Sequence, residues 1–294
     1  MAIFKGSGVA LVTPFKENLE VDYEQLRKIT NWHVEHGTDA IIVCGTTGEA
    51  STLTEEEHSE CIAVVAEEVN GRIPVIAGTG SNATYTAVKL SKEAEQSGVD
   101  GLLVVTPYYN KATQNGLIRH YTEIANAVSV PIIMYNVPSR TGCHILPATA
   151  VKLAKEVDNI VAIKEATGVI EQVKNIIAGA PEGFCVYSGD DSFTYDLMKA
   201  GGAGVISTIS NVATKRMKEI VDACAAGNWD EALELNAKLL PLMEGLFATT
   251  NPILVKEALA LVGFPVGGVR LPLVDATPEQ SKVLEGIMRE VGVL

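Results

Sequence analysis

The chain has 294 residues, of which 47% are hydrophobic, and it carries a formal net charge of −13 at pH 7. Such an acidic excess argues against non-specific binding to nucleic acid and to anionic membrane surfaces, so neither is expected as a partner. If the substrate is itself an anion, its binding site must provide a local cation.

Five cysteines are widely scattered, an odd number without a CxxC spacing, and we expect all of them to be reduced thiols. The first residues, MAIFKGSGVALVTPFKE, contain too short an apolar stretch for a signal peptide. No apolar run approaches the length of about 18 residues that spans a membrane. We therefore expect a cytoplasmic protein.

Apolar runs of strand length recur along the chain at intervals of roughly 25 to 35 residues. The eight runs are Val9–Val12, Ala40–Cys44, Pro74–Ala77, Gly101–Val105, Pro131–Tyr135, Ile160–Lys164, Phe184–Tyr187 and Gly204–Ile206. They are continuous rather than alternating with polar residues, as is typical of parallel strands that are covered on both faces.

Stretches with helical spacing separate these runs. Examples are Tyr23–His36, Glu55–Val69, Asn82–Ser97, Gln114–Ala127, Pro147–Glu156 and Asp191–Ala200. Thr54 followed by Glu57 predicts a capping box, and Pro147 predicts a helix start. Eight strand–helix units predict an α/β protein of the (β/α)8 TIM barrel type, and the count of eight favours the barrel over its main alternative, a doubly wound open sheet.

No further strand is expected after about Gly227. The remaining residues predict three helices, near Trp229–Phe247, Pro252–Val262 and Pro278–Val291. We therefore expect a catalytic barrel over residues 1–226 and a C-terminal helical extension over residues 227–294.

Lys164 stands at the end of the apolar run that begins at Ile160. A lysine rarely lies in a protein core unless it is paired or chemically used. Burial disfavours the ammonium and lowers its pKa, and a neutral amine can attack a ketone to form a Schiff base. The competing interpretation is a strand-end lysine whose amine reaches water.

Functional residues of a barrel gather at the carboxyl ends of its strands. The segments that follow the predicted strands are Gly45–Glu49, Thr106–Asn110, Tyr135–Gly142, Lys164–Ala166, Ser188–Asp191 and Ile206–Ser207. Tyr135 offers a phenol for proton transfer, or else fills the barrel as an aromatic core residue. Arg140 suits a carboxylate ligand, or else forms a surface salt bridge. Histidines and cysteines are not clustered there, so no metal site is expected.

Six motifs resemble those of the dihydrodipicolinate synthase family, which belongs to the pyruvate-dependent class I aldolases. They are GTTGE (45–49), TPYYN (106–110), YNVPSRTG (135–142), IKEATG (163–168), SGDD (188–191) and NPILVK (251–256), and the match runs from about Ile3 to Leu294. The resemblance implies a lyase that condenses pyruvate with L-aspartate 4-semialdehyde through a lysine Schiff base. The product would be 4-hydroxy-tetrahydrodipicolinate, in the first committed step of diaminopimelate and lysine biosynthesis. No cofactor is implied.

The resemblance also implies roles for the catalytic residues. Lys164 matches the Schiff-base lysine. Tyr135, Thr46 and Tyr109 match a proton-relay triad, in which the tyrosine at the Tyr109 position reaches the site of a neighbouring subunit. The family is usually a homotetramer built as a dimer of dimers, so we expect at least a dimer.

Four further residues match substrate-binding positions of the family. Arg140 resembles the residue that receives the carboxylate of the semialdehyde, and Thr47 resembles a holder of the pyruvate carboxylate. Gly189 and Ile206 resemble residues at the pyruvate end, where Ile206 offers its backbone carbonyl.

An effector pocket of the family is only partly matched. Ser51, His58, Asn82 and Tyr108 match residues that bind L-lysine in the lysine-sensitive members. Thr86 stands where those members carry a glutamate, and Glu55 stands where they carry a histidine. Since a threonine hydroxyl brings no charge to an ammonium ligand, we expect weak or absent inhibition by L-lysine.

Two alternatives remain open. Another pyruvate aldolase, such as N-acetylneuraminate lyase or a keto-deoxy sugar-acid aldolase, would keep Lys164 and Tyr135 but needs polar contacts for a sugar chain. A protein of another class would be a non-catalytic barrel that binds a keto acid. Arg140 argues against the first alternative, and the intact lysine, tyrosines and threonines argue against the second.

Overall fold

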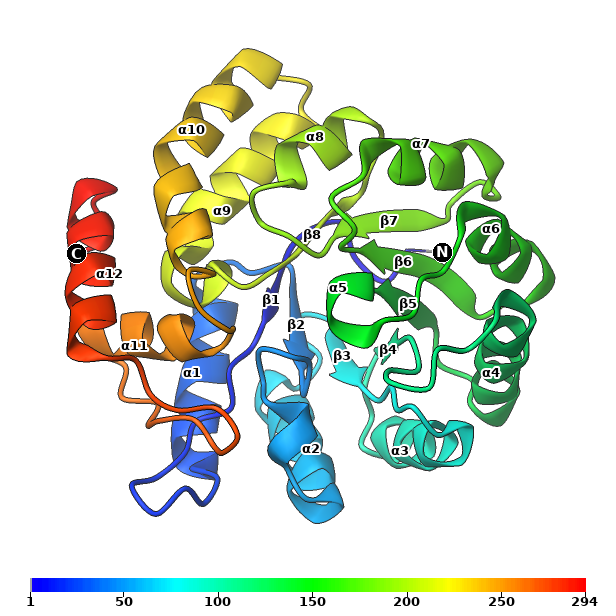
Figure 1. Ribbon diagram of the computed structural model, residues 1–294, viewed down its shortest axis with the longest axis horizontal. Helices are drawn as coiled ribbons and strands as arrows, with labels where there is room; N and C mark the ends of the chain where they lie inside the picture. The colour runs from blue at the N-terminus through cyan, green and yellow to red at the C-terminus, as the bar shows by residue number, and fades with distance from the viewer. Residues whose placement is uncertain (1) are drawn as a thin grey trace.

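The computed structural model describes residues 2–294, and its centre is a closed barrel of parallel strands (Figure 1). The strands are β1 (Gly6–Ala10), β2 (Ala40–Val43), β3 (Val75–Gly78), β4 (Gly101–Val105), β5 (Ile132–Asn136), β6 (Ile160–Glu165), β7 (Cys185–Ser188) and β8 (Gly204–Ser207). Each strand pairs with the next one in the chain, and β8 pairs with β1. The predicted (β/α)8 barrel is confirmed, and the open sheet is wrong.

The helices form a ring outside the barrel (Figure 1). They are α1 (Tyr23–Glu35), α2 (Glu55–Val69), α3 (Thr84–Gln96), α4 (Gln114–Ala127), α5 (Pro138–Thr141), α6 (Pro147–Glu156), α7 (Ile170–Gly179), α8 (Thr194–Lys199) and α9 (Ser210–Ala225), with a 3₁₀ turn, η1 (Ala50–Thr52), before α2. The capping box of Thr54 with Glu57 and the start of α6 at Pro147 are confirmed.

The three predicted C-terminal helices are also confirmed. They are α10 (Trp229–Gly245), α11 (Ile253–Leu261) and α12 (Pro278–Glu290). In Figure 1 they lie together on the side of the barrel that carries α1 and α9. The division of the chain into a catalytic barrel (residues 1–226) and a helical extension (residues 227–294) stays a prediction. Met1, the first residue of the predicted barrel segment, lies outside the described residues.

Two predicted starts, those of β1 and α8, are wrong by three residues. β1 begins at Gly6 rather than at Val9, because the closing strand β8 pairs Gly6 with Gly204. A side chain at Gly204 would place its Cβ 1.9 Å from the Gly6 carbonyl oxygen, so this pairing requires glycine, which carries no apolar signal. α8 begins at Thr194 rather than at Asp191, because the residues before it form turns, in which the Phe193 and Thr194 N–H groups donate to the carbonyl oxygens of Asp190 and Asp191.

The barrel interior is filled at its amino-terminal end. Phe4, which precedes β1, stacks on the ring of Tyr187 with 4.5 Å between ring centroids. The Tyr187 hydroxyl donates a hydrogen bond to the Phe4 carbonyl oxygen at 2.5 Å. Since this end is packed with side chains, the carboxyl ends of the strands are left as the place for a cavity.

All five cysteines are free and buried. Among the helices of residues 2–294, none combines the length and the apolar composition that crossing a membrane requires.

Candidate active site

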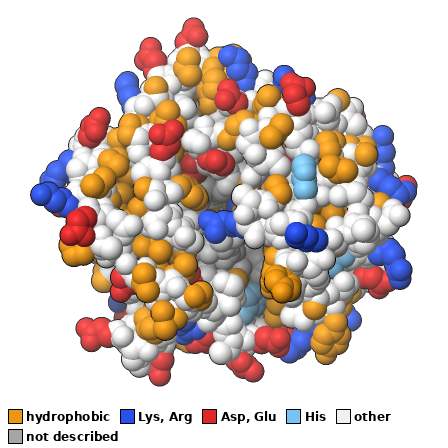
Figure 2. Space-filling model, in the orientation of Figure 1, with side chains coloured by type: hydrophobic (Ala, Val, Ile, Leu, Met, Phe, Trp, Pro, Cys, Tyr) orange, Lys and Arg blue, Asp and Glu red, His pale blue; other side chains and the backbone are white. Residues whose placement is uncertain are grey.

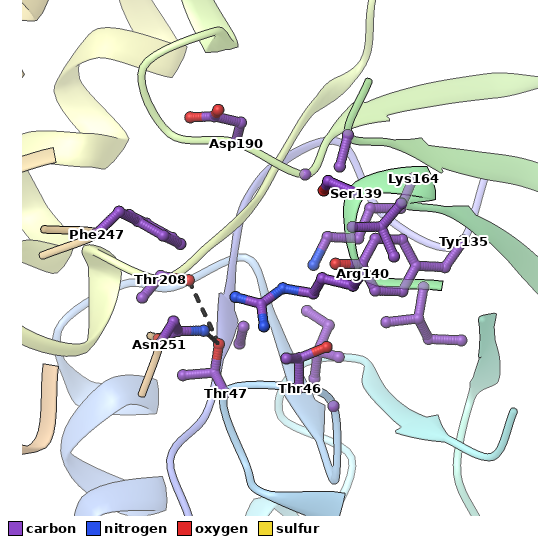
Figure 3. A pocket seen from close by; sticks show the side chains of 17 residues that line it. Thr46, Thr47, Tyr135, Ser139, Arg140, Lys164, Asp190, Thr208, Phe247 and Asn251 are labelled. Atoms are coloured by element: carbon purple, nitrogen blue, oxygen red, sulfur yellow. Dashed lines mark hydrogen bonds between the residues drawn. The ribbon is translucent and has the colours of Figure 1, made fainter. Parts of the chain in front are cut away.

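A cavity opens at the carboxyl ends of the strands (Figure 3). Its lining residues are Ala10, Ile42, Gly45, Thr46, Thr47, Leu103, Tyr135, Val137, Ser139, Arg140, Lys164, Ala166, Gly189, Asp190, Thr208, Phe247 and Asn251. Most of them come from strand ends or the loops that follow, where the barrel rule places a site.

Lys164 lies inside the barrel rather than at its surface. Side chains alternate along β6, so Glu165 faces outward, where its carboxylate accepts hydrogen bonds from the side-chain amides of Asn136 (3.0 Å) and Gln172 (3.2 Å). Lys164 therefore faces inward and is only 6% exposed. The alternative of an amine that reaches bulk water does not hold.

The amine of Lys164 is tuned toward its neutral form. Its Nζ lies 4.4 Å from the centroid of the Tyr135 ring, and it has no salt-bridge partner among residues 2–294. Burial lowers the pKa of Lys164 to about 8, with a further lowering by the charge of Arg140 that the buried Asp191 opposes. At a pKa of about 8, roughly one amine in ten is neutral at pH 7.

Tyr135 and Thr46 lie beside this amine (Figure 3). Tyr135 is buried, and that burial raises the pKa of its phenol, while the charge of Arg140 and the hydroxyl of Thr46 act in the opposite direction. A phenol that stays protonated can donate a proton to a departing oxygen and take it back.

Arg140 provides the local cation that an anionic ligand would need. It lies in the short helix α5, and its guanidinium points into the cavity from the mouth (Figure 3). Basic side chains lie at the rim of the central hollow in Figure 2. No carboxylate of residues 2–294 forms a salt bridge with Arg140, which argues against the surface salt bridge.

Thr47 is held by two side chains that the sequence analysis missed. The Asn251 side-chain amide donates to the Thr47 hydroxyl oxygen at 2.9 Å, and the Thr208 hydroxyl lies 3.3 Å from it. Phe247, from the turn after α10, lines the same side. The NPILVK motif was a signal for Asn251, whereas no signal in the sequence indicated Phe247.

Gly189 lies directly against the side chain of Lys164. A Cβ at this position would lie 3.0 Å from Lys164 Cε and 2.8 Å from Ala166 Cβ, so a larger residue would displace the lysine. Ile206 is fully buried among the barrel-filling side chains, and on the β8 side the cavity is lined by Thr208 instead.

Tyr109 is not brought to the cavity of its own chain. Its side chain is 88% exposed, and its backbone has a φ of +76°. The Tyr109 N–H donates to the Thr141 carbonyl oxygen at 3.1 Å, which ties this loop to the helix that carries Arg140. The tyrosine therefore projects outward from a fixed backbone next to the site.

The four predicted effector residues come from four neighbouring parts of the chain: Ser51 lies in η1, His58 in α2, Asn82 in the loop before α3 and Tyr108 in the loop after β4. His58 is buried, with its Nε2 2.7 Å from the Gly78 carbonyl oxygen, and Tyr108 is 41% exposed. Asn110 donates from its side-chain amide to the Asn82 carbonyl oxygen at 2.9 Å, and Ser51 is exposed in η1.

Glu55, which could supply the missing charge of that pocket, is bound elsewhere. Its carboxylate accepts a hydrogen bond from the amine of Lys89 on α3. Reaching an effector would therefore require Glu55 to leave this partner.

The cavity thus brings together the Lys164 amine, whose pKa is lowered, the Tyr135 phenol, whose pKa is raised, and the Arg140 guanidinium. That combination suits a small keto acid: the amine can attack the carbonyl carbon, the phenol can move protons on its oxygen, and a carboxylate can bind at the mouth.

Comparison with known proteins agrees with this chemistry. The family model described as the dihydrodipicolinate synthetase family matches residues 3–291. The chain belongs to this family. The 4-hydroxy-tetrahydrodipicolinate synthase of Lachnoclostridium phytofermentans is 51% identical over 294 residues, which is the full length of both chains.

Solved structures of family members superpose closely on this chain. Dihydrodipicolinate synthase from Acinetobacter baumannii, in complex with pyruvate, is 45% identical with a TM-score of 0.96 over 99% of each chain. The enzyme from Cyanidioschyzon merolae, with lysine bound, is 42% identical with a TM-score of 0.98 over all of both chains.

The electrostatics of the cavity give a prediction for Asp191→Asn. Asp191 raises the pKa of Lys164, so removal of its negative charge should lower that pKa further and leave more neutral amine at a given pH. Asparagine keeps a side-chain oxygen for the Thr208 and Ile209 N–H groups. Acetic anhydride acylates neutral amines, so labelling of Lys164 against pH, followed by peptide mass spectrometry, should show a lower midpoint in the variant.

Exposed lysines of the same protein serve as the internal reference in that experiment. Burial raises the pKa of Asp191 itself to about 6, so the comparison is made above that pH, where the parent carries the charge. An unchanged or higher midpoint for Lys164 would contradict the described electrostatics.

Proposed function

We propose that this chain makes 4-hydroxy-tetrahydrodipicolinate from pyruvate and L-aspartate 4-semialdehyde through a Schiff base on Lys164. The chain has the 4-hydroxy-tetrahydrodipicolinate synthase function of its family, a lyase step of lysine and diaminopimelate biosynthesis. The observation that carries the proposed mechanism is the buried amine of Lys164, which burial tunes toward its neutral form beside Tyr135.

The first step forms the imine. The lone pair of the neutral Lys164 amine attacks the keto carbon of pyruvate, and a proton moves to the carbonyl oxygen to give a carbinolamine. Loss of that oxygen as water needs a second proton, for which Tyr135 is the nearest phenol, with Thr46 beside it. Thr47 and the turn that carries it hold the pyruvate carboxylate. Gly189 leaves room for the adduct. The side chain of Ile206 does not line the cavity, so its proposed part at the pyruvate end is limited to its backbone carbonyl.

The second step forms the carbon–carbon bond. The cationic imine draws electrons from the methyl group, so a methyl proton is lost and an enamine forms. The enamine carbon attacks the aldehyde carbon of the second substrate, and the aldehyde oxygen is protonated. The semialdehyde's own amine then adds to the imine carbon, closes the ring and releases Lys164 as a free amine. The electron sink of this route is the cationic imine between pyruvate and Lys164.

One assay tests this function against its alternatives. Purified protein is supplied with pyruvate and either L-aspartate 4-semialdehyde or N-acetylmannosamine, and it is separately treated with pyruvate and sodium borohydride. With pyruvate present in both reactions, we expect turnover with L-aspartate 4-semialdehyde and none with N-acetylmannosamine. Borohydride should leave a reduced pyruvyl adduct on Lys164. Lys164→Ala should lose several kcal/mol of transition-state stabilisation. Turnover of the amino sugar would indicate a sialic acid lyase, and an adduct without any turnover would indicate a binding protein.

Arg140 is proposed to receive the carboxylate of the semialdehyde. Arg140→Ala removes a charge-assisted bidentate contact worth about 1.5–3 kcal/mol, so the KM for the semialdehyde should rise roughly 10- to 150-fold. Imine formation with pyruvate should continue. Steady-state kinetics and borohydride trapping on the same preparation measure both quantities. Failure of the variant to form the pyruvate adduct would assign Arg140 to the first step instead.

The active unit is proposed to be at least a dimer, and a dimer of dimers in the complete assembly. The support is Tyr109, whose exposed ring projects away from its own cavity beside the Arg140 helix. In a neighbouring subunit this ring would complete the relay of Tyr135 and Thr46.

Subunit mixing tests the shared site. Tyr109→Phe and Lys164→Ala chains should each be nearly inactive. Hybrids of the two should regain activity, because one site per hybrid dimer then has both intact groups. Hybrids whose formation is proven by mass spectrometry but which remain inactive would contradict a shared site.

Inhibition by L-lysine is proposed to be weak or absent. Thr86 offers no negative charge to an ammonium ligand, and Glu55 is engaged with Lys89. The loss of a charge-assisted bond of about 1.5–3 kcal/mol weakens binding roughly 10- to 150-fold. Activity is measured against increasing L-lysine at subsaturating pyruvate. Half-inhibition below about 1 mM would show that the pocket still binds tightly.

A further inference from the structure

The turn that carries Thr46 and Thr47, residues 45–49 and here named the catalytic turn, is held in an uncommon backbone conformation. Glu49 ends it with a φ of +53°, in the left-handed region that non-glycine residues rarely adopt. Its N–H donates to the Thr46 carbonyl oxygen at 3.1 Å. A conformation of this kind persists only where surrounding contacts fix it.

The side chain of Glu49 provides such contacts. One carboxylate oxygen accepts a hydrogen bond from Lys256 Nζ at 2.8 Å, and the other accepts the backbone N–H of Arg270 at 3.1 Å. The side chains of Glu49 and Lys256 are each 2% exposed. Lys256 also donates to the Gly268 carbonyl oxygen at 2.6 Å and lies over the Phe15 ring. Both oxygens of the carboxylate are thus occupied by the C-terminal part of the chain.

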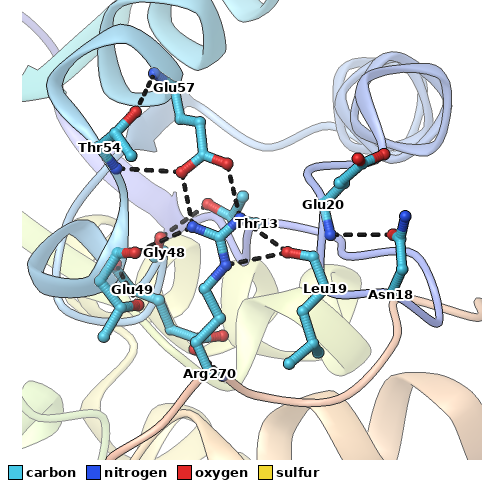
Figure 4. Close-up of polar contacts among 10 residues, drawn as sticks. Thr13, Asn18, Leu19, Glu20, Gly48, Glu49, Thr54, Glu57 and Arg270 are labelled. Carbon is cyan, nitrogen blue, oxygen red and sulfur yellow. Dashed lines mark hydrogen bonds and ion pairs between the residues drawn. The ribbon is translucent and has the colours of Figure 1, made fainter.

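Arg270 is itself anchored on the opposite side (Figure 4). Its guanidinium donates to the Glu57 carboxylate at 2.6 Å and to the Leu19 carbonyl oxygen at 2.7 Å. The backbone around Arg270 is therefore a fixed point for Glu49. The turn is also held directly, because the Thr13 hydroxyl donates to the Gly48 carbonyl oxygen at 2.7 Å.

Asn251 forms a second contact between the C-terminal part of the chain and the catalytic turn. It precedes α11, the helix that contains Lys256, and its amide donates to the Thr47 hydroxyl at 2.9 Å. Thr47 and Glu49 are thus bound to a single stretch of chain, residues 251–256. Glu49, Lys256 and Arg270 do not line the cavity, so they act on a ligand only through the turn.

We propose that the buried Lys256–Glu49 ion pair is a positioning pair for the catalytic turn, through which the C-terminal helices set the geometry of Thr46 and Thr47 for the reaction. The inference rests on the proposed function, because it assumes the proton-transfer role of Thr46 and the carboxylate-binding role of Thr47. Removal of the pair lets the turn shift, and a misplacement of about 1 Å at reacting groups can cost about a hundredfold in rate.

Glu49→Gln tests this role. The variant keeps the shape of the side chain but leaves the Lys256 charge buried without its partner. Borohydride trapping at saturating pyruvate counts the folded sites, and kcat and the pyruvate KM are then expressed per trapped site. The kinetics are measured at a temperature well below the unfolding temperature of the variant. We expect kcat/KM for pyruvate, expressed per trapped site, to fall at least about tenfold.

Two further variants separate positioning from stability. Glu57→Gln removes the carboxylate charge beside Arg270 but leaves its guanidinium bound to the carbonyl oxygens of Leu19 and Thr52, so the position of Arg270 is kept. Glutamine at position 57 also keeps the capping box. It should lower the unfolding temperature while kcat/KM per trapped site stays within about twofold of the parent value. The double variant Glu49→Gln/Lys256→Met removes both charges, so neither is left buried alone. It should fold, even if Glu49→Gln does not, and should show the same loss of kcat/KM.

The outcomes are distinct. A parent protein that traps no pyruvate would overturn the proposed function itself. A parent that traps pyruvate, with Glu49→Gln and the double variant within about twofold of parental kcat/KM per trapped site, would overturn the positioning role and leave a stabilising ion pair only.

Discussion

The desolvation of a single amine is the constraint on which the rest of the structure depends. An exposed lysine, with a pKa of about 10.4, is neutral in roughly one molecule in a few thousand at pH 7. Burial inside the barrel lowers the pKa of Lys164 to about 8, which increases the neutral fraction by a few hundredfold. The closed barrel makes this possible, because β6 presents Lys164 to an interior whose other end is filled by Phe4 and Tyr187.

The two buried lysines of the core show how the surroundings decide the chemistry. Burial lowers the pKa of both side chains. Lys256 is compensated by Glu49 at 2.8 Å and by the Gly268 carbonyl oxygen, so its amine is fully engaged. Lys164 instead contacts the ring of Tyr135, forms no salt bridge with Asp191, and has the positive charge of Arg140 nearby. Lys164, which has no ion-pair partner, faces the cavity. Lys256, which is paired with Glu49, holds the turn that lines this cavity.

The sequence was sufficient to predict the barrel fold and those cavity residues that interrupt a local pattern of side chains. Lys164 could be predicted because a lysine in an apolar strand is anomalous, and Arg140 because it follows a strand end. The residues that position the site could not be found in this way. Asn251 contacts Thr47 across 204 residues, and Lys256 contacts Glu49 across 207 residues, so periodicity carries no information about them. Gly6 and Gly204 close the barrel but lack the apolar side chains by which strands are recognised.

The central claim is that burial, acting on Lys164, makes a nucleophile at neutral pH. The most direct measurement is the initial rate of pyruvate adduct formation against pH, followed by rapid borohydride quenching and peptide mapping. The described surroundings predict a rate that rises with pH below a midpoint of about 8 and levels off above it, with the adduct on Lys164. A midpoint near about 10.4, the value of an exposed lysine, or an adduct on a different lysine would contradict the claim.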